Sequence, residues 1–296
     1  MKRFLIVFIG MCLYLLLAME VALRVFNKVT DPMIEQVVGG VLLYKPGQQG
    51  KWLRGSNAEI KSEFKVNKDG WNSEREYDYV TGKKYIAIIG DSYIEGLHVP
   101  PDSSIGRKIE SLCPDVVVHE YGKSGWASED YKGAFEKYCN EKYDKVFIVM
   151  TNEDLFDTSK SFGKIALKAD DNNFVRNLYY TSAVLRYANI QLGFWENLHA
   201  ILRFRETNGH AFNDVANNSN QTDNQKMDRR KYFDDFPSNV FFLYENDKLV
   251  PYYQHYLGLR GIEIRHSTNK TGFGFDPHWN NQARWDVARA IMDKLK

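Results

Sequence analysis

Short apolar runs alternate with amphipathic stretches over most of the chain after residue 83. Continuous apolar runs of this kind are typical of strands that are buried on both faces. Five such strands are expected, at 85–89, 116–118, 146–150, 240–244 and 261–264. Amphipathic periodicity predicts helices at 104–112, 128–139, 174–192 and 281–295. This alternation predicts an α/β fold, in which a parallel sheet carries helices on both faces.

Ser128 is the expected N-cap of the helix at 128–139, since a serine hydroxyl can accept a hydrogen bond from the first helical turn. Glu129 and Asp130 follow it and suit the positive end of the helix dipole. In parallel sheets, ligands bind beyond the carboxyl ends of the strands. Candidate chemistry is therefore sought in the residues that directly follow each predicted strand.

The N-terminal segment 4–19 has no charged residue and follows Lys2 and Arg3. With the apolar residues up to Leu23, it reaches the ~20 residues that a helix needs to cross a bilayer. No small-residue cleavage site is evident, which favours an uncleaved anchor at residues 1–26 over a removed signal peptide. A buried soluble helix is disfavoured, because the segment is apolar on every side.

The charges beside this segment favour a cytoplasmic N-terminus, because Lys2 and Arg3 precede it. Arg24 and Lys28 lie on the other flank and weaken the signal. We expect a single-pass membrane protein whose main domain is periplasmic or extracellular.

Two regions follow the expected anchor. Residues 27–82 are polar, with a turn signal at 67–70, and predict a membrane-proximal collar or hairpin. Residues 83–296 form the expected main domain, which contains an insertion at about 155–236. Within that insertion, 208–225 is rich in Asn and poor in apolar residues, as a surface loop would be.

Composition excludes several classes of protein. The 296 residues carry 39 Lys and Arg against 38 Asp and Glu, a net charge of +1, which argues against a nucleic-acid binder. Three cysteines exclude a disulfide-dense scaffold and a four-cysteine zinc site. Cys113 and Cys139 would form a disulfide in an oxidising compartment or remain two buried thiols, and both alternatives stay open. Common phosphate, dinucleotide and zinc-protease motifs are absent.

Two polar segments suggest nucleophilic catalysis. Ser92 lies just past the first strand, in Gly90-Asp91-Ser92-Tyr93-Ile94-Glu95-Gly96, where a hydroxyl and a backbone N–H can face a ligand. A strand-to-helix turn with local hydrogen bonds explains this segment equally well. Asp276 lies two residues before His278, and such a carboxylate can orient an imidazole that takes a proton from serine.

The other six histidines, among them His98, lack such a setting and are expected to be structural or exposed. Gly125 follows the second strand, where a glycine can expose an N–H, although a plain turn explains it more simply. Asn152 follows the third strand and could donate its amide to an oxyanion, or cap a helix.

Together these segments resemble the SGNH/GDSL hydrolase family. Gly90-Asp91-Ser92 with Gly96 is similar to the first family block, Gly122-x-Ser124-Gly125 to the second, and Asp276-Pro277-His278 to the last. The resemblance implies a three-layer α/β/α, flavodoxin-like fold and a triad of Ser92 as nucleophile, His278 as general base and acid, and Asp276 as its orienting partner. It also implies an oxyanion hole of the Ser92 and Gly125 N–H groups and the Asn152 amide, with no metal or organic cofactor.

Three departures from the family pattern concern the oxyanion hole more than the triad. In the third block, either Asn152 or Glu153 holds the asparagine position, and Asn152 is chosen because a carboxylate would repel an oxyanion. Glu120 replaces an asparagine common at the start of the second block. Ala283 replaces a glycine common five residues after the final histidine.

The Asp-x-His-Trp-Asn spacing is similar to the branch that includes alginate O-acetyltransferase-like proteins. We therefore expect a membrane-anchored serine esterase that removes O-acetyl groups from an extracytoplasmic glycan. The alternatives are an O-acyltransferase acting on a cell-envelope polysaccharide, and a non-catalytic envelope scaffold or glycan-binding module. The expected partners are the acylated glycan and the membrane, and no nucleic acid. Trp71 and Trp126 are candidates for sugar stacking, although ordinary packing is the simpler role for either.

Overall fold

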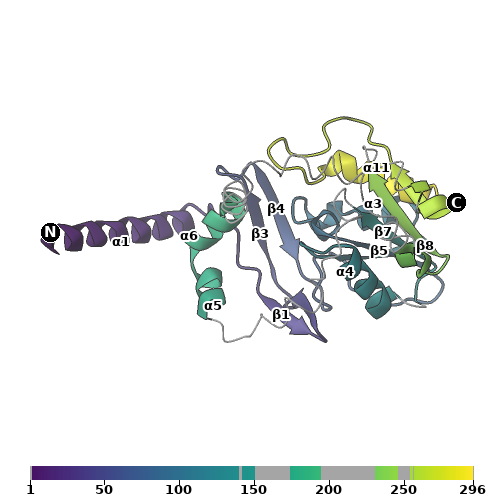
Figure 1. The fold of residues 1–296 in the computed structure, drawn as a ribbon, viewed down its shortest axis with the longest axis horizontal. Coiled ribbons are helices and arrows are strands. Elements are labelled where there is room, and N and C mark those ends of the chain that lie inside the picture. Colours follow the sequence, from purple (N-terminus) through teal and green to yellow (C-terminus); the bar gives the residue numbers. More distant parts are fainter. Residues whose placement is uncertain are drawn as a thin grey trace.

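A computed structural model of the protein describes residues 2–139, 142–150, 174–194, 231–245, 254–255 and 257–295. The expected surface loop at 208–225 lies outside these residues, as do Asn152 and Glu153. The expected N-terminal helix is present as α1 (Lys2–Val25), and none of its side chains is buried. It extends away from the rest of the protein (Figure 1). Its length and composition are sufficient to cross a membrane.

In the described part of the chain, the main sheet has five strands, all paired in parallel, in the order β6-β5-β7-β8-β9. They are β5 (Lys84–Gly90), β6 (Val116–Gly122), β7 (Lys145–Met150), β8 (Val240–Glu245) and β9 (Gly261–Ile264). Numbered within this sheet, the order is 2-1-3-4-5, which is the flavodoxin-like order of a doubly wound sheet. The expected parallel sheet is therefore confirmed. Strand β6 runs four residues beyond its apolar triplet, because the polar residues His119 and Glu120 are buried within it.

Both faces of this sheet are covered by helices, since alternate residues of β5 enter two different hydrophobic clusters. Ala87 and Ile89 pack in the cluster of α4 (Ser128–Ala134) and the π-helical turn η2 (Phe135–Cys139). Ile86 and Ile88 pack in the other cluster, with α3 (Ile105–Leu112) and α11 (Asn281–Met292). The expected three-layer α/β/α fold is confirmed.

The helix ends show one wrong prediction. Ser128 does not cap α4: the N-cap is Ala127, and the Asp130 carboxylate accepts a 3.0 Å hydrogen bond from the Ala127 N–H. A carboxylate three residues into a helix reaches its first N–H groups as readily as a serine at the cap does. Ser104 caps α3, and the Asn280 side chain caps α11 by accepting from two backbone N–H groups.

Between α1 and the main sheet lies a collar of two antiparallel hairpins (Figure 1). Its strands are β1 (Glu35–Val38), β2 (Val41–Tyr44), β3 (Gln49–Arg54) and β4 (Ile60–Lys65). Tyr44, Trp52 and Phe64 of these strands pack with Leu97, which follows the first strand of the main sheet. Because of this packing, the collar shares a buried core with the segment that carries Ser92.

The helical region predicted at 174–192 consists of three short elements beside α1. They are α5 (Phe174–Thr181), α6 (Ala183–Arg186) and the π-helical turn η4 (Tyr187–Gln191). The remaining short elements are α2 (Ser92–Glu95), η1 (Pro101–Ser103) and η6 (Gly258–Arg260).

Two side-chain questions from the sequence concern residues inside the core. Cys113 and Cys139 are free thiols and belong to the two clusters on opposite faces of the sheet, so they do not pair. Trp71 and Trp126 are 2% and 6% exposed, with ring centroids 5.9 Å apart. Neither ring is available to a sugar, and packing is their role.

Candidate active site

Ser92 lies at the carboxyl end of β5, as the first residue of the one-turn helix α2. The Asp91 side chain caps this helix by accepting a 2.9 Å hydrogen bond from the Tyr93 N–H. Gly96 ends it in the left-handed conformation, with a φ of 71° that glycine adopts without strain. The turn therefore holds Ser92 at the edge of the sheet, where its side chain is only half-buried.

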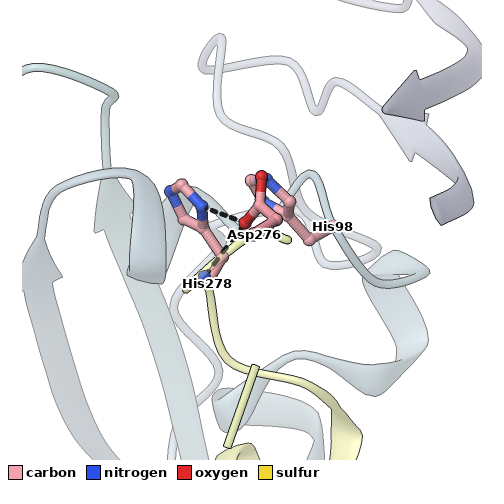
Figure 2. Close-up of side chains that lie close together, drawn as sticks. All are labelled: His98, Asp276 and His278. Atoms are coloured by element: carbon pink, nitrogen blue, oxygen red, sulfur yellow. Dashed lines mark hydrogen bonds and ion pairs between the residues drawn. The ribbon is translucent and has the colours of Figure 1, made fainter. Parts of the chain in front are cut away.

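The loop before α11 brings a histidine and an aspartate to this serine. His278 Nε2 lies 2.8 Å from Ser92 Oγ. His278 Nδ1 lies 2.7 Å from Asp276 Oδ1 (Figure 2). Asp276 Oδ1 also accepts a 3.0 Å hydrogen bond from the His278 N–H, which fixes the carboxylate beside the ring. Asp276 is 2% exposed, whereas Ser92 and His278 are half-buried. The hydroxyl, the imidazole and the carboxylate are thus hydrogen-bonded in the same order as in the triad of a serine hydrolase.

The second oxygen of Asp276 has two partners that the sequence did not reveal. Arg54 Nε, from β3 of the collar, lies 3.2 Å from Asp276 Oδ2. His98 Nε2 lies 3.5 Å from the same oxygen. Burial raises the pKa of Asp276, but hydrogen bonds from His278 and His98 outweigh it and bring this pKa well below its ordinary value. Asp276 is therefore ionised at neutral pH.

His98, which the sequence predicts to be structural or exposed, is buried beside Asp276 and His278. Its ring stacks on that of His278 with centroids 3.8 Å apart and planes 13° from parallel. The ring of Trp52 also packs against His98, with the two centroids 4.3 Å apart. Burial lowers the pKa of His98 to about 4, so the ring is neutral at neutral pH. No local pattern marks His98, since its contact with His278 arises only from the folding of distant loops.

His98, Asp276 and His278 also form a set of potential metal ligands, with donor atoms within 4.8 Å of one another. A metal ion bound to an imidazole nitrogen lies close to the plane of the ring. Two stacked, nearly parallel rings cannot both direct a nitrogen at one ion. The ring nitrogens of His278 already face Asp276 and Ser92, so this cluster fits a hydrogen-bonded triad better than a metal centre.

The second block leaves the sheet beside the first. Gly90 and Gly122 are paired in register, and the Lys123 N–H donates to the Gly90 carbonyl at 3.3 Å. A Cβ at Gly122 would lie 2.1 Å from the backbone nitrogen of Glu95, so only glycine allows this approach. Gly125 follows with a φ of 81° in the exposed part of the loop.

Glu95 holds the loop that carries Gly125 through hydrogen bonds. Its carboxylate, which belongs to α2, accepts hydrogen bonds from the N–H and hydroxyl of Ser124. It also accepts a 2.7 Å bond from the Tyr44 hydroxyl of the collar and lies 3.4 Å from Lys123 Nζ. The loop that carries Gly125 is thus tied to the turn that carries Ser92. The oxyanion roles of Ser92, Gly125 and Asn152 stay predictions, and Asn152 and Glu153 lie outside the described residues.

Glu120, which replaces the asparagine common at the start of the second family block, is buried beneath α3 rather than turned toward Ser92. Its carboxyl accepts a 2.5 Å hydrogen bond from the Ser104 hydroxyl. Burial raises the pKa of Glu120. The Glu120 side chain therefore supports the start of α3. Ala283, the last departure, is fully buried in the cluster under α11.

Arg284 of α11 connects the loop that carries Ser92 with the loop that carries His278, and it was not predicted. It is fully buried, and its Nη2 donates a 2.8 Å hydrogen bond to the carbonyl of Tyr93, the residue after Ser92. Its Nε donates at 3.4 Å to the carbonyl of Trp279, the residue after His278. Burial lowers the pKa of Arg284 to about 10, so it stays charged at neutral pH. One guanidinium thus holds the backbone of both loops.

The strand order, with Ser92 after the first strand of the sheet and Asp276 and His278 before the last helix, matches what the resemblance to the SGNH/GDSL family implies. The fold is the three-layer α/β/α, flavodoxin-like fold that this resemblance implies.

Comparison with known proteins gives matches among solved structures. A member of the lipolytic G-D-S-L family from Veillonella parvula is 10% identical, with a TM-score of 0.35, over 71% of this chain and 97% of that one. A lipase from a goat rumen metagenome is 12% identical, with a TM-score of 0.35, over 71% and 97%. An acetyl xylan esterase from Geobacillus stearothermophilus is 12% identical, with a TM-score of 0.36, over 72% and 95%. No family model and no curated protein matches the sequence.

Proposed function

We propose that the protein is a serine esterase of the SGNH type. The observation that carries this proposal is the hydrogen-bonded line from Ser92 Oγ through His278 to Asp276, at 2.8 Å and 2.7 Å. His278 takes the hydroxyl proton as Ser92 attacks an ester carbonyl, and the Asp276 carboxylate stabilises the imidazolium that forms. His278 then protonates the leaving alcohol. Water, activated by His278, releases the acid from the acyl-enzyme.

The developing oxyanion needs hydrogen-bond donors, and in this proposal they are the N–H groups of Ser92 and Gly125 and the amide of Asn152. The register between Gly90 and Gly122 supports the first two, because the two loops leave neighbouring strands at the same level. Each lost donor typically costs about 2.7–4 kcal/mol of transition-state stabilisation. An imperfect third block would therefore slow the reaction and leave its mechanism unchanged.

The proposed substrate is an O-acetyl group on an extracytoplasmic glycan, with the protein anchored through α1. The length and apolar character of α1 support the anchor, and Lys2 and Arg3 support a cytoplasmic N-terminus. The glycan follows from the similarity of the Asp-x-His-Trp-Asn segment to alginate O-acetyltransferase-like proteins.

A fluorophosphonate probe tests the nucleophile in the full-length protein in detergent. The wild type is expected to be labelled, and Ser92→Ala is expected to lose all labelling. The exposed Ser56 provides a matched control, so Ser56→Ala should be labelled like the wild type. Folded wild type that resists the probe would contradict the proposal and favour a non-catalytic scaffold or glycan-binding module.

A second experiment separates hydrolysis from acyl transfer, since one acyl-enzyme serves both. The purified protein is incubated with an acetyl donor, with and without a de-O-acetylated acceptor glycan. Release of free acetate that does not depend on the glycan is the expected result. Acetylated glycan with little free acetate would make the protein an O-acyltransferase instead.

A further inference from the structure

The three short elements after residue 173 are attached to the C-terminal end of the anchor helix. Glu20, in the last turns of α1, accepts hydrogen bonds from the N–H groups of Ala183 and Val184 at 2.8 and 2.9 Å. It also accepts one from the Ser182 hydroxyl at 3.1 Å, and Arg24 donates to the Thr181 carbonyl. Elements α5 and α6 lie beside the end of α1 and run across its axis in Figure 1.

The depth of this attachment follows from helix geometry. At 1.5 Å per residue, Glu20 lies about 24 Å along α1 from Phe4, where the apolar run begins. The hydrocarbon core of a bilayer is about 30 Å thick. If α1 spans the bilayer, any element that is hydrogen-bonded to Glu20 lies at the lipid–water interface and cannot stand clear of the membrane.

In residues 174–194, a charged side chain is buried and large apolar side chains are exposed, which is the reverse of the usual arrangement in a helix on the surface of a soluble protein. Arg186 is 5% exposed, and its Nε donates a 2.9 Å hydrogen bond to the Thr30 carbonyl. Leu178 and Leu185, in contrast, are 45% and 40% exposed. In α5, the exposed positions Phe174, Asn177, Leu178 and Thr181 share one face at helical spacing, and the two large side chains among them are apolar.

The inner face of the same residues is polar and lines a cavity of about 350 Å³ against the collar. Arg176, Tyr179, Tyr180 and Arg186 contribute to its wall. A helix that packs on a soluble protein directs its apolar stripe to the core and its charges to water. Here charged and phenolic groups face the protein, whereas large apolar side chains face outward. Such a reversal suits an apolar surrounding.

We propose that residues 174–194 form an interfacial segment that lies on the bilayer, with Phe174, Leu178, Leu185, Leu192 and Phe194 turned into the lipid. This inference rests on the proposed anchoring by α1. The exposed apolar surface continues onto the end of α1, where Val25 and the next residue, Phe26, are each 70% exposed. Arg24 and Lys28 at the same level suit the headgroup region. A lipid surface would cover the segment and the helix end together.

The interfacial segment would also fix how the catalytic body stands on the membrane. The Ile190 carbonyl in η4 accepts a 2.7 Å hydrogen bond from Arg54 Nη1, and Arg54 contacts Asp276. With both α1 and the segment on the bilayer, tilting of the body about the single anchor is restricted. Ser92 would then be held at one height above the lipid.

Depth-dependent fluorescence tests the proposal on the full-length chain in nanodiscs that hold one copy each. An NBD fluorophore is attached at a single cysteine, introduced as Leu178→Cys or Leu185→Cys in a background in which Cys12, Cys113 and Cys139 are alanine. Leu13→Cys reports on the anchor, and Leu259→Cys, which is 95% exposed on η6, is the matched water-exposed control. If the cysteine-free background fails to fold, a fluorescent amino acid is incorporated at 178 and 185 in the natural chain.

Labels at 178 and 185 are expected to show blue-shifted emission relative to the label at 259. Most of their fluorescence intensity should be lost when nitroxide-labelled lipids are added. Quenching at 13 without quenching at 178 and 185 would overturn the interfacial segment and leave the anchor in place. Absence of quenching at all positions would overturn the anchoring and the segment together. Blue-shifted emission at 178 and 185 that lipid nitroxides do not quench would mean that protein covers the segment, which also overturns the proposal.

Discussion

Arg54 Nε lies 3.2 Å from Oδ2 of Asp276, although 222 residues separate the two in the chain. The collar thus completes the carboxylate end of the proposed triad. His278 occupies one oxygen of Asp276, and Arg54 and His98 lie at the other. This arrangement prevents the carboxylate from rotating away from the imidazole. Arg54 also places a fixed positive charge near the ring that has to accept a proton.

Replacing Arg54 by methionine is expected to lower kcat by about 10- to 150-fold, because a charged hydrogen bond that positions Asp276 is worth about 1.5–3 kcal/mol. KM should change little, since Arg54 does not reach the serine. The acidic limb of the pH–rate profile should move to higher pH, because a positive charge that opposes protonation of the imidazole is lost. Steady-state kinetics with a soluble aryl acetate between pH 5 and 8 measure kcat, KM and the position of the acidic limb.

Two further variants separate positioning from general destabilisation. Arg54→Lys keeps the positive charge, so its acidic limb should stay near that of the wild type even if kcat falls. Arg75 is a collar arginine that is ion-paired to Glu110 at 2.7 Å, away from the triad. Arg75→Met should leave kcat and the pH profile unchanged. An Arg54→Met enzyme with wild-type kcat and profile would show that Arg54 has no part in orienting Asp276.

The residues that were foreseen and those that were missed differ in how local their signals are. Ser92 directly follows a buried apolar strand, and Asp276 and His278 directly precede a capped helix, so short segments were enough to place them at the sheet edge. The five strands were also local features, since each is a run of buried apolar residues. Such local patterns can be recognised in the sequence without any knowledge of distant contacts.

Arg54, His98 and Arg284 have no such local pattern. Their contacts depend on how the collar, the turn after Ser92 and the last helix pack together. A buried arginine in an amphipathic helix has the same sequence signature as an exposed one, and only the carbonyls of Tyr93 and Trp279 distinguish it. The cap of α4 was missed for a different reason: the Asp130 carboxylate reaches back to the Ala127 N–H, so the N-cap lies one residue before Ser128.

The buried histidines predict a loss of stability in mild acid. Burial, the largest influence in each case, lowers the pKa of His98 and His119 to about 4, whereas a histidine in the unfolded chain titrates near 6.5. Between these values the unfolded state binds protons that the native state does not, so the free energy of unfolding falls as the pH falls. For His98 alone the loss approaches about 3 kcal/mol at pH 4. Urea denaturation at pH 7, 5.5 and 4.5 measures it.

His98→Asn should make this pH dependence shallower, because one of the two groups is removed. His119 is equally buried but lies on the other face of the sheet, where its Nδ1 is 2.7 Å from the Tyr143 hydroxyl. His119→Asn should therefore reduce the slope in the same way while leaving ester hydrolysis by the folded protein unchanged. A wild-type stability that is flat from pH 6.5 to 4.5 would contradict the buried, neutral state of both rings.

Arg284→Met tests whether one guanidinium aligns the nucleophile and base loops. Loss of its hydrogen bonds leaves the Tyr93 and Trp279 carbonyls unpaired, at a cost of about 1–3 kcal/mol of unfolding free energy for each. Because both loops then loosen, kcat should fall at temperatures at which circular dichroism shows the variant to be folded. Arg289 provides a control on the same helix: its side chain is 59% exposed and ion-paired to Asp286. Arg289→Met should change the unfolding free energy by no more than about 0.5 kcal/mol and leave kcat unchanged. If Arg284→Met is less stable yet keeps the wild-type kcat, Arg284 serves the core alone.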